Sequence, residues 1–562
     1  MNTKFKLLTL FGFLCSGFAF GQLGETKEVF THQDTLRGSL NADRTWWDVM
    51  KYSILVSPDY EKKAITGKVD IRFKVLGAGK RMQIDLQEPM ELTKAFLGDK
   101  KMNYTRDGNA YFIEIPAGMQ LAKGSIQTLA LGFKGDPKIA KRAPWDGGWI
   151  FQKDEKGRPW MTVACQGLGA SVWYPCKDHQ SDEPDNGAVL MITVPDTLVA
   201  VGNGRLISKT SFEPGKMTWR WEVKNPINNY NLVPYIGKYV NFTDTVMGEK
   251  GKLDMSYWVL DYNLEKAKKQ FTQAKTMIHA FEYWMGPYPF YEDSYKLVDA
   301  PHLGMEHQTA VAYGNKYMNG YLGRDLSGTG WGLKWDFIIV HESGHEWFAN
   351  NITSKDLADM WIHEGFTNYS ETLFTEYVYG KEAGNEYNYG SRKGIRNDRP
   401  IIGPYGVNKE GSGDMYPKSG SMLQSIRHAM NNDDKFREML RFLNKKFYHK
   451  TVTTEDIQQV VSQYFGSSIE KIFDQYLRTT KIPVLEYYVS ADKKLMYRYT
   501  NCVDGFNLPV LLSTDKGITF LGPESNKWNS KDLNGDISSY KLDSIEKNFY
   551  VKVKQVSADA KQ

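Results

Sequence analysis

The sequence predicts a multidomain α+β protein in which two β-rich parts flank a mainly helical part. Hydrophobic and polar residues alternate in the first and last parts, whereas apolar residues recur every three or four positions in between. The chain has 562 residues, and single cores stop growing near about 250 residues, so several domains are needed. We place these domains at residues 22–240, 241–482 and 483–562.

Residues 1–21 have the pattern of a signal peptide. Two early lysines precede an apolar run over residues 7–20, and Ala19-Phe20-Gly21 before Gln22 has the small-x-small form of a cleavage site. A membrane anchor is the alternative, but the run is shorter than the ~20 apolar residues that a span needs. We therefore expect export to a periplasm or the medium, without a stable membrane anchor.

Composition excludes two classes of protein. A net charge of +5 over this length, with no dense Lys/Arg block, argues against a nucleic-acid partner. Beyond the leader only Cys165, Cys176 and Cys502 remain, so the chain is not a disulfide scaffold. Cys165 and Cys176 are either bridged or present as two free buried thiols.

The first domain shows the period-two pattern of half-buried strands. Residues 68–75 read Lys-Val-Asp-Ile-Arg-Phe-Lys-Val, and residues 217–223 read Met-Thr-Trp-Arg-Trp-Glu-Val, with Gly, Pro, Asn and Asp between such runs. The same alternation returns at residues 484–489 and 549–553. These segments predict an N-terminal β domain and a small C-terminal β module.

The middle domain shows helical periodicity instead. We predict helices over residues 264–284, 331–350, 361–379, 419–430, 434–447 and 454–464. The last of them is preceded by Thr453, with Asp456 three residues later, which is a capping pattern.

One predicted helix carries a metal-binding motif. The sequence His341-Glu342-Ser343-Gly344-His345 fits H-E-x-x-H. Residues four apart share a helix face, so both imidazoles can reach one metal, while Glu342 lies about 100° round the helix. Zinc accepts such ligands, and a catalytic zinc site uses three protein ligands and a water. Two histidines therefore need a third partner.

Glu364 is the candidate for the third ligand. Eighteen residues separate it from His345, which is enough to end one helix, turn, and bring a second helix antiparallel to the first. His363 is the alternative, although on a regular helix it points roughly 100° away from its neighbour. With one Zn²⁺ on this set, the bound water would have a pKa of about 7 and Glu342 would act as its general base.

These residues resemble a known enzyme family. The eighteen-residue spacing, together with the segments His345-Glu346-Trp347-Phe348-Ala349-Asn350 and Trp361-Ile362-His363-Glu364-Gly365-Phe366, is similar to the gluzincin aminopeptidases that include aminopeptidase N and leukotriene A hydrolase. The family usually has Asn where His363 stands. The resemblance implies zinc held by His341, His345 and Glu364.

Three further segments resemble family motifs. Leu303-Gly304-Met305-Glu306-His307 matches G-x-M-E-N except at its first and last residues, which implies substrate binding by Gly304 and Met305 and capture of the substrate α-ammonium by Glu306. Tyr416, in Tyr416-Pro417-Lys418-Ser419-Gly420, is similar to the tyrosine that stabilises the oxyanion. Gln166, ahead of Trp173-Tyr174-Pro175, resembles the residue that contacts the substrate amine across the domain interface.

The resemblance covers nearly the whole chain after the leader. It implies a β saddle, a thermolysin-like catalytic domain and a small β sandwich, in a short form without the large C-terminal helical domain of longer members. The expected function is a zinc aminopeptidase that removes N-terminal residues from peptides with free N-termini. The alternatives are a thermolysin-type endopeptidase and a non-catalytic zinc-containing binding protein.

Overall fold

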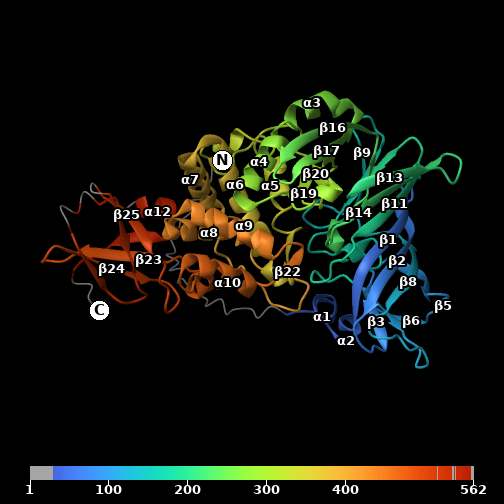
Figure 1. The fold of residues 1–562 in the computed structure, drawn as a ribbon, viewed down its shortest axis with the longest axis horizontal. Coiled ribbons are helices and arrows are strands. Elements are labelled where there is room, and N and C mark those ends of the chain that lie inside the picture. The colour runs from blue at the N-terminus through green and yellow to red at the C-terminus, as the bar shows by residue number, and fades with distance from the viewer. Residues whose placement is uncertain (1–28, 515–516, 534–536, 538–539, 543, 559–562) are drawn as a thin grey trace, which may run out of the picture.

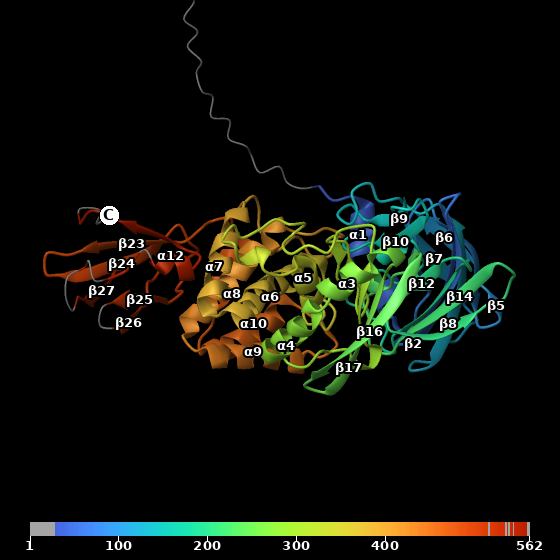
Figure 2. The same ribbon diagram turned by 90° about the horizontal axis from the view of Figure 1, so that it is seen from above.

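The computed structural model describes residues 29–514, 517–533, 537, 540–542 and 544–558. Figures 1 and 2 show the N-terminal strands in blue and cyan at one end, helices in yellow and orange in the middle, and the last strands in red at the other end. The predicted leader of residues 1–21 lies outside the described residues and stays a prediction. Among the described helices, none combines the length and apolar character that crossing a bilayer requires.

The N-terminal part is built on an eight-stranded sheet with the order β13-β14-β11-β1-β2-β8-β4-β5. Its strands are β1 (Trp47–Asp59), β2 (Ala64–Val75), β4 (Glu91–Leu97), β5 (Lys100–Lys101), β8 (Ile126–Gly135), β11 (Ala188–Pro195), β13 (Arg205–Thr210) and β14 (Lys216–Val223). In β2, Val69, Ile71 and Phe73 are buried, whereas Arg72 and Lys74 are exposed. The predicted alternation is therefore confirmed here, because one face of the sheet covers the core.

Two smaller sheets complete this part. One contains β3 (Arg81–Asp85), β7 (Ala110–Glu114) and β6 (Tyr104–Asp107), and the other contains β12 (Val199–Val201), β15 (Tyr235–Gly237), β10 (Pro159–Ala164) and β9 (Gly148–Lys153). Trp47, Trp149 and Trp173 are fully buried in the shared core. Two short helices, α1 (His32–Gly38) and α2 (Ala42–Thr45), precede the first strand. Cys165 and Cys176 are free buried thiols.

A five-stranded sheet begins the middle part. Its order is β16-β17-β18-β20-β19, formed by β16 (Tyr239–Gly248), β17 (Gly251–Leu260), β18 (Tyr295–Asp299), β20 (Val311–Tyr313) and β19 (Gly304–Met305). The edge strand β19 pairs antiparallel with β20 through Gly304 and Met305. The two residues of the predicted Gly-Met-Glu motif that precede Glu306 therefore form the free edge of this sheet.

Helices make up most of the middle part. They are α3 (Leu264–Gln270), α4 (Gln273–Met285), α5 (Phe337–Gly344), α6 (Trp361–Tyr379), α7 (Lys381–Ser391), α8 (Pro417–Met430), α9 (Asp433–Lys446), α10 (Thr454–Phe465) and α11 (Glu470–Arg478). A short parallel pair, β21 (Ile352–Ser354) with β22 (Lys450–Val452), lies among them. Helix α6 matches its predicted range, and Thr453 and Asp456 form the predicted capping box of α10.

In the middle part, two predicted helices were too long, and two described helices were not predicted. Residues 264–284 divide into α3 and α4, with a break at Phe271 and Thr272. Residues 331–350 contain a 3-10 turn (Trp331–Leu333) and α5 in place of one long helix, because the Asp336 side chain caps the start of α5 and the backbone turns away after Gly344, reaching φ 143° at Ala349. Helices α7 and α11 went unpredicted.

The last part contains two small sheets. One has the order β27-β24-β23-β28, formed by β27 (Asn529–Asp532), β24 (Lys494–Thr500), β23 (Val484–Val489) and β28 (Lys552–Gln555); the other pairs β25 (Val510–Thr514) with β26 (Gly517–Leu521). Helix α12 (Ser544–Asn548) packs near α7 and α8, and the Tyr476 hydroxyl donates to the Tyr550 carbonyl at 2.9 Å. This part shares one hydrophobic core with the helices. Its description as a β sandwich remains a prediction.

Candidate active site

The nine residues predicted as metal ligands, catalytic groups or substrate contacts all line one cavity of about 570 Å³. They come from both large parts of the chain: Gln166 follows β10, Gly304, Met305 and Glu306 lie at the β19 edge, and the rest come from the helical part, namely His341, Glu342, His345, Glu364 and Tyr416. The cavity therefore depends on how the N-terminal β part and the helical part dock.

Helix α5 positions the two histidines. Its start is fixed by the buried Asp336 carboxylate, which accepts from the backbone N–H of Ile338 at 3.1 Å and of Ile339 at 3.3 Å. His341 lies within the helix and His345 at its C-cap, still with helical dihedral angles of φ −63° and ψ −19°. Both rings therefore keep the shared face that the four-residue spacing predicts.

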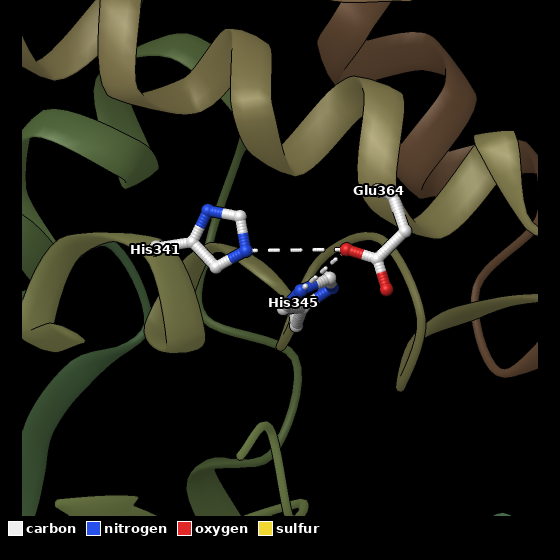
Figure 3. A group of neighbouring side chains, drawn as sticks. All are labelled: His341, His345 and Glu364. Carbon is white, nitrogen blue, oxygen red and sulfur yellow. Dashed lines mark ion pairs between the residues drawn. The ribbon is translucent and has the colours of Figure 1, made fainter. Parts of the chain in front are cut away.

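Glu364 approaches the histidines from the first turn of α6 (Figure 3). Its Oε2 atom lies 3.9 Å from His341 Nε2 and 3.3 Å from His345 Nε2. Within the described part of the chain this buried oxygen has no hydrogen-bond partner, and a buried acceptor without a partner is costly. Burial alone would raise the pKa of the Glu364 carboxyl, but the charges of His345 and His341 hold it well below its usual range.

The other ring nitrogen of each histidine is occupied. His341 Nδ1 lies 2.7 Å from Glu371 Oε1, and His345 Nδ1 lies 3.1 Å from the Phe348 carbonyl oxygen. Each Nδ1–H donates in these bonds, and both Nε2 atoms face Glu364. Two imidazoles and one carboxylate with these separations fit the donor set and tetrahedral spacing of a catalytic zinc ion.

His363, the alternative ligand, points elsewhere. Its Nε2 atom accepts a hydrogen bond from the Ser354 backbone N–H at 2.8 Å. The ring is fully buried, and burial lowers its pKa to about 3, so it is neutral. His363 therefore supports the backbone at β21 and does not join the ligand group.

Glu342 extends into the cavity beside this group. Burial raises the pKa of its carboxyl to about 7, with the charges of Glu306 and Glu364 adding to the rise and the two histidines opposing it. The Glu342 carboxylate needs the glycine on the neighbouring strand, because a Cβ atom at Gly304 would lie 2.6 Å from Glu342 Oε1. Gly304 thus makes room for the carboxylate.

Glu306 is held from both large parts of the chain. The Tyr230 hydroxyl donates to Glu306 Oε1 at 2.9 Å, and the Asn350 amide donates to the Glu306 carbonyl at 2.9 Å. One carboxylate oxygen of Glu306 lies within 4.8 Å of ligand atoms of both Glu342 and His345. Burial raises the pKa of Glu306, and so does the charge of Glu364.

Gln166 and Tyr416 close two further sides. Gln166 Nε2 donates to Glu364 Oε1 at 3.1 Å, so in this structure it contacts the carboxylate that faces the histidines. The Tyr416 ring lies 6.0 Å from the His341 ring, nearly parallel to it, at the start of α8. Burial raises the pKa of Tyr416 well above its usual range, so its hydroxyl stays protonated.

Sequence reasoning missed three carboxylate or phenol groups of the site. Glu371 stands seven residues after Glu364, which is two helical turns, so its place on the same face of α6 could have been predicted. Tyr230 lies in a single 3-10 turn (Asn229–Asn231) and Glu410 in an irregular segment, and no sequence periodicity marks either of them. Glu410 lines the cavity, and burial raises its pKa to about 7.

Comparison with known proteins finds similarity to peptidases. Residues 262–476 match the model described as "Peptidase family M1 domain". The chain is 22% identical over 343 residues to leukotriene A-4 hydrolase of Xenopus laevis, covering 57% of this chain and 53% of that protein. It is 24% identical over 352 residues to leucine aminopeptidase 2 of Saccharomyces cerevisiae (strain YJM789), covering 59% and 46%. The chain thus spans about half the length of these curated relatives.

Solved structures share the fold. The M1 zinc metallopeptidase from Deinococcus radiodurans superposes with a TM-score of 0.65 at 20% sequence identity, covering 78% of this chain and 95% of that one. A mutant of the same enzyme bound to a Tyr-Ser-Ala substrate gives a TM-score of 0.63 at 20% identity, covering 77% and 95%. Residues 262–476 therefore match a peptidase family M1 domain, and the chain shares the two-domain M1 metallopeptidase fold of an N-terminal β-rich domain and a helical catalytic domain.

Proposed function

We propose that this protein is a zinc aminopeptidase that hydrolyses the first peptide bond of peptides with a free N-terminus. One observation carries the proposal: a Glu306 carboxylate oxygen lies within 4.8 Å of ligand atoms of both Glu342 and His345. A carboxylate so close to the reacting groups binds the α-ammonium and sets the distance from the chain end to the scissile bond.

His341, His345 and Glu364 would hold the metal. When bound there, zinc would supply a Lewis acid that polarises the scissile carbonyl and acidifies a water. The Nδ1 bonds to Glu371 and to the Phe348 carbonyl fix the ring orientations and keep each Nε2 free for coordination.

Glu342 moves the proton. A carboxylate with a pKa raised to about 7 takes a proton from the attacking water and returns it to the departing amine near neutral pH. Burial is the main cause of that raised pKa, and the cavity wall at Gly304 keeps the carboxylate beside the metal ligands.

Four further residues orient the substrate, namely Gly304, Met305, Gln166 and Tyr416. The free edge of β19 offers backbone groups to an extended peptide, which is a common way to hold a substrate strand. Gln166 completes the pocket for the amine next to Glu306. The protonated Tyr416 hydroxyl donates to the oxyanion that forms at the attacked carbonyl, a contribution of a few kcal/mol.

Free and N-acetylated versions of the same aminoacyl anilides and dipeptides test this function, each with and without a chelator. Wild-type protein should cleave only the free forms, and chelation should abolish cleavage. Glu306→Gln should reduce kcat/KM for the free forms by about 10–100-fold, since a charge-assisted contact is lost. Cleavage of acetylated peptides inside the chain would instead indicate a thermolysin-type endopeptidase, and zinc binding without any cleavage a binding protein.

A further inference from the structure

Glu410 is a carboxylate of the cavity that the mechanism above does not use. It lies in the irregular segment between α7 and α8 and lines the cavity together with Gln166 and Tyr416. The other four carboxylates that line this cavity already have a role: Glu364 faces the histidines, Glu371 accepts from His341, Glu342 is the proposed base and Glu306 the proposed α-ammonium site. Glu410 therefore needs a separate explanation.

The Glu410 carboxylate forms no ion pair with a cation in the described part of the chain. Within the described ranges no hydrogen bond acts on its pKa, which burial raises to about 7, with the charges of Glu364 and Glu306 adding to the rise. Arg399 is the cation that opposes this shift, and its guanidinium donates to the Gly411 carbonyl at 2.9 Å. A carboxylate kept unpaired in a site that already holds Glu306, Glu342 and Glu364 favours a cationic ligand.

The backbone beside Gln166 leaves space for this carboxylate. Gly167 has φ +70°, and a Cβ atom built on it would lie 2.7 Å from Glu410 Oε1. In this segment the Gln166 side-chain amide points toward Glu364. Gly167, which has no side chain, leaves room for the Glu410 carboxylate.

Glu410 also lines a second cavity, of about 470 Å³, that adjoins the first. The two cavities share Trp145, Gln166 and Glu410. The lining of the second cavity includes neither Glu306 and Glu342 nor the three candidate metal ligands. Glu410 therefore stands beside Gln166 where the two cavities adjoin, and the second cavity offers room for a long side chain there.

We propose, on the basis of the aminopeptidase function above, that Glu410 is a specificity-determining residue that favours peptides whose first residue is lysine or arginine. The ammonium or guanidinium of that side chain would pair with the Glu410 carboxylate, while the α-ammonium would bind Glu306 and Gln166. The long aliphatic stem would cross the mouth of the second cavity beside Trp145.

Binding of L-lysinamide and L-norleucinamide tests this directly, because they differ only in the ε-amine. Calorimetric titrations would compare the zinc-loaded Glu342→Gln variant with the zinc-loaded double variant, which carries Glu342→Gln and Glu410→Gln. Lysinamide should bind about tenfold or more tightly than norleucinamide when Glu410 is present, and the ratio should approach one in the double variant. The matched control is Glu61→Gln, at an exposed position of the N-terminal part, which should leave the ratio unchanged.

The same ratio should appear in turnover. Wild-type kcat/KM for lysyl-aminomethylcoumarin should exceed that for the norleucyl analogue, and Glu410→Gln should reduce only the lysyl value. An unchanged ratio would overturn the proposal, as would an equal loss for both compounds, which would place Glu410 at the α-ammonium. If the wild type bound and cleaved neither compound, the aminopeptidase function itself would fail, an outcome distinct from a lost lysine preference.

Discussion

His341 Nδ1 lies 2.7 Å from Glu371 Oε1, and this carboxylate is itself fixed from two sides. The Tyr387 hydroxyl donates to Glu371 Oε2 at 2.6 Å, and the Asn368 amide donates to Oε1 at 3.2 Å. Burial lowers the pKa of His341, but the bond to Glu371 and its charge outweigh burial and raise it overall. Glu371 thus sets the tautomer and orientation of a candidate zinc ligand.

Glu371→Gln should therefore weaken zinc binding by about 10–100-fold, as is typical when the partner of a metal-ligating histidine is lost. Zinc affinity can be measured by competition with a chromogenic chelator. Glu382→Gln, at an exposed position of α7, is the control and should bind zinc like the wild type. Equal affinities in both variants would mean that Glu371 has only a structural role.

Replacing the proposed base separates metal binding from catalysis. Glu342→Gln keeps the size of the side chain and leaves His341, His345 and Glu364 in place, so zinc content should stay at one ion per chain. Without the carboxylate no group takes the proton of the attacking water, and kcat should fall by about 10²–10⁴-fold. Zinc analysis and steady-state kinetics on one preparation check both parts, and near wild-type turnover would reject Glu342 as the base.

The candidate metal site could be anticipated from local spacing, whereas its surroundings could not. His341 and His345 share a face because they are four residues apart, and this holds even though α5 ends at Gly344. The place of Glu371 could have been predicted in the same way, because it follows Glu364 by seven residues, or two helical turns. Tyr230 and Glu410 reach the cavity only because separate segments dock there, and a sequence pattern records periodicity within an element, not contacts between elements.

In the fold, too, features set within one element could be predicted, whereas those set by contacts between elements could not. The alternation in β2 and the periodicity of α6 gave correct elements, since one face of each covers a core. The predicted helix over residues 331–350 was wrong at both ends because tertiary contacts decide its limits. Asp336, for example, accepts from the Tyr313 hydroxyl at 2.7 Å as well as capping α5, which fixes the helix start.

Removing the Tyr416 hydroxyl tests the proposed oxyanion contact. The pKa of Tyr416 is raised by burial and then by the charges of Glu364 and Glu410, so the hydroxyl remains a donor across the neutral range. Tyr416→Phe should lower kcat by about 10²–10³-fold with little change in KM, because the bond forms only in the transition state. Tyr377→Phe, at an exposed position of α6, should match the wild type. A change confined to KM would reassign Tyr416 to ground-state binding.

Glu183 should make stability depend on pH. Its Oε1 atom accepts from the Thr353 hydroxyl of β21 at 2.6 Å, which joins the N-terminal β part to the helical part. Burial raises the pKa of Glu183 to about 8. The pKa of Glu183 in the folded protein therefore exceeds its pKa in the unfolded chain. The contribution of this carboxyl to the free energy of unfolding is fully present below about pH 4 and is lost as the pH rises through about 8.

Glu183→Gln removes this titration while preserving the shape of a protonated glutamate. At pH 5 the variant and the wild type should melt at similar temperatures, since the Glu183 carboxyl is protonated in the folded wild type. At pH 9 the variant should be more stable, by on the order of 1–3 kcal/mol, and its Tm should be higher by several degrees. Calorimetric melts at half-unit pH steps measure the difference, with Glu61→Gln as the exposed control. Other buried groups titrate in both proteins and cancel in the comparison, so a Tm difference that stayed constant from pH 5 to pH 9 would show that Glu183 is ionised in the folded protein throughout.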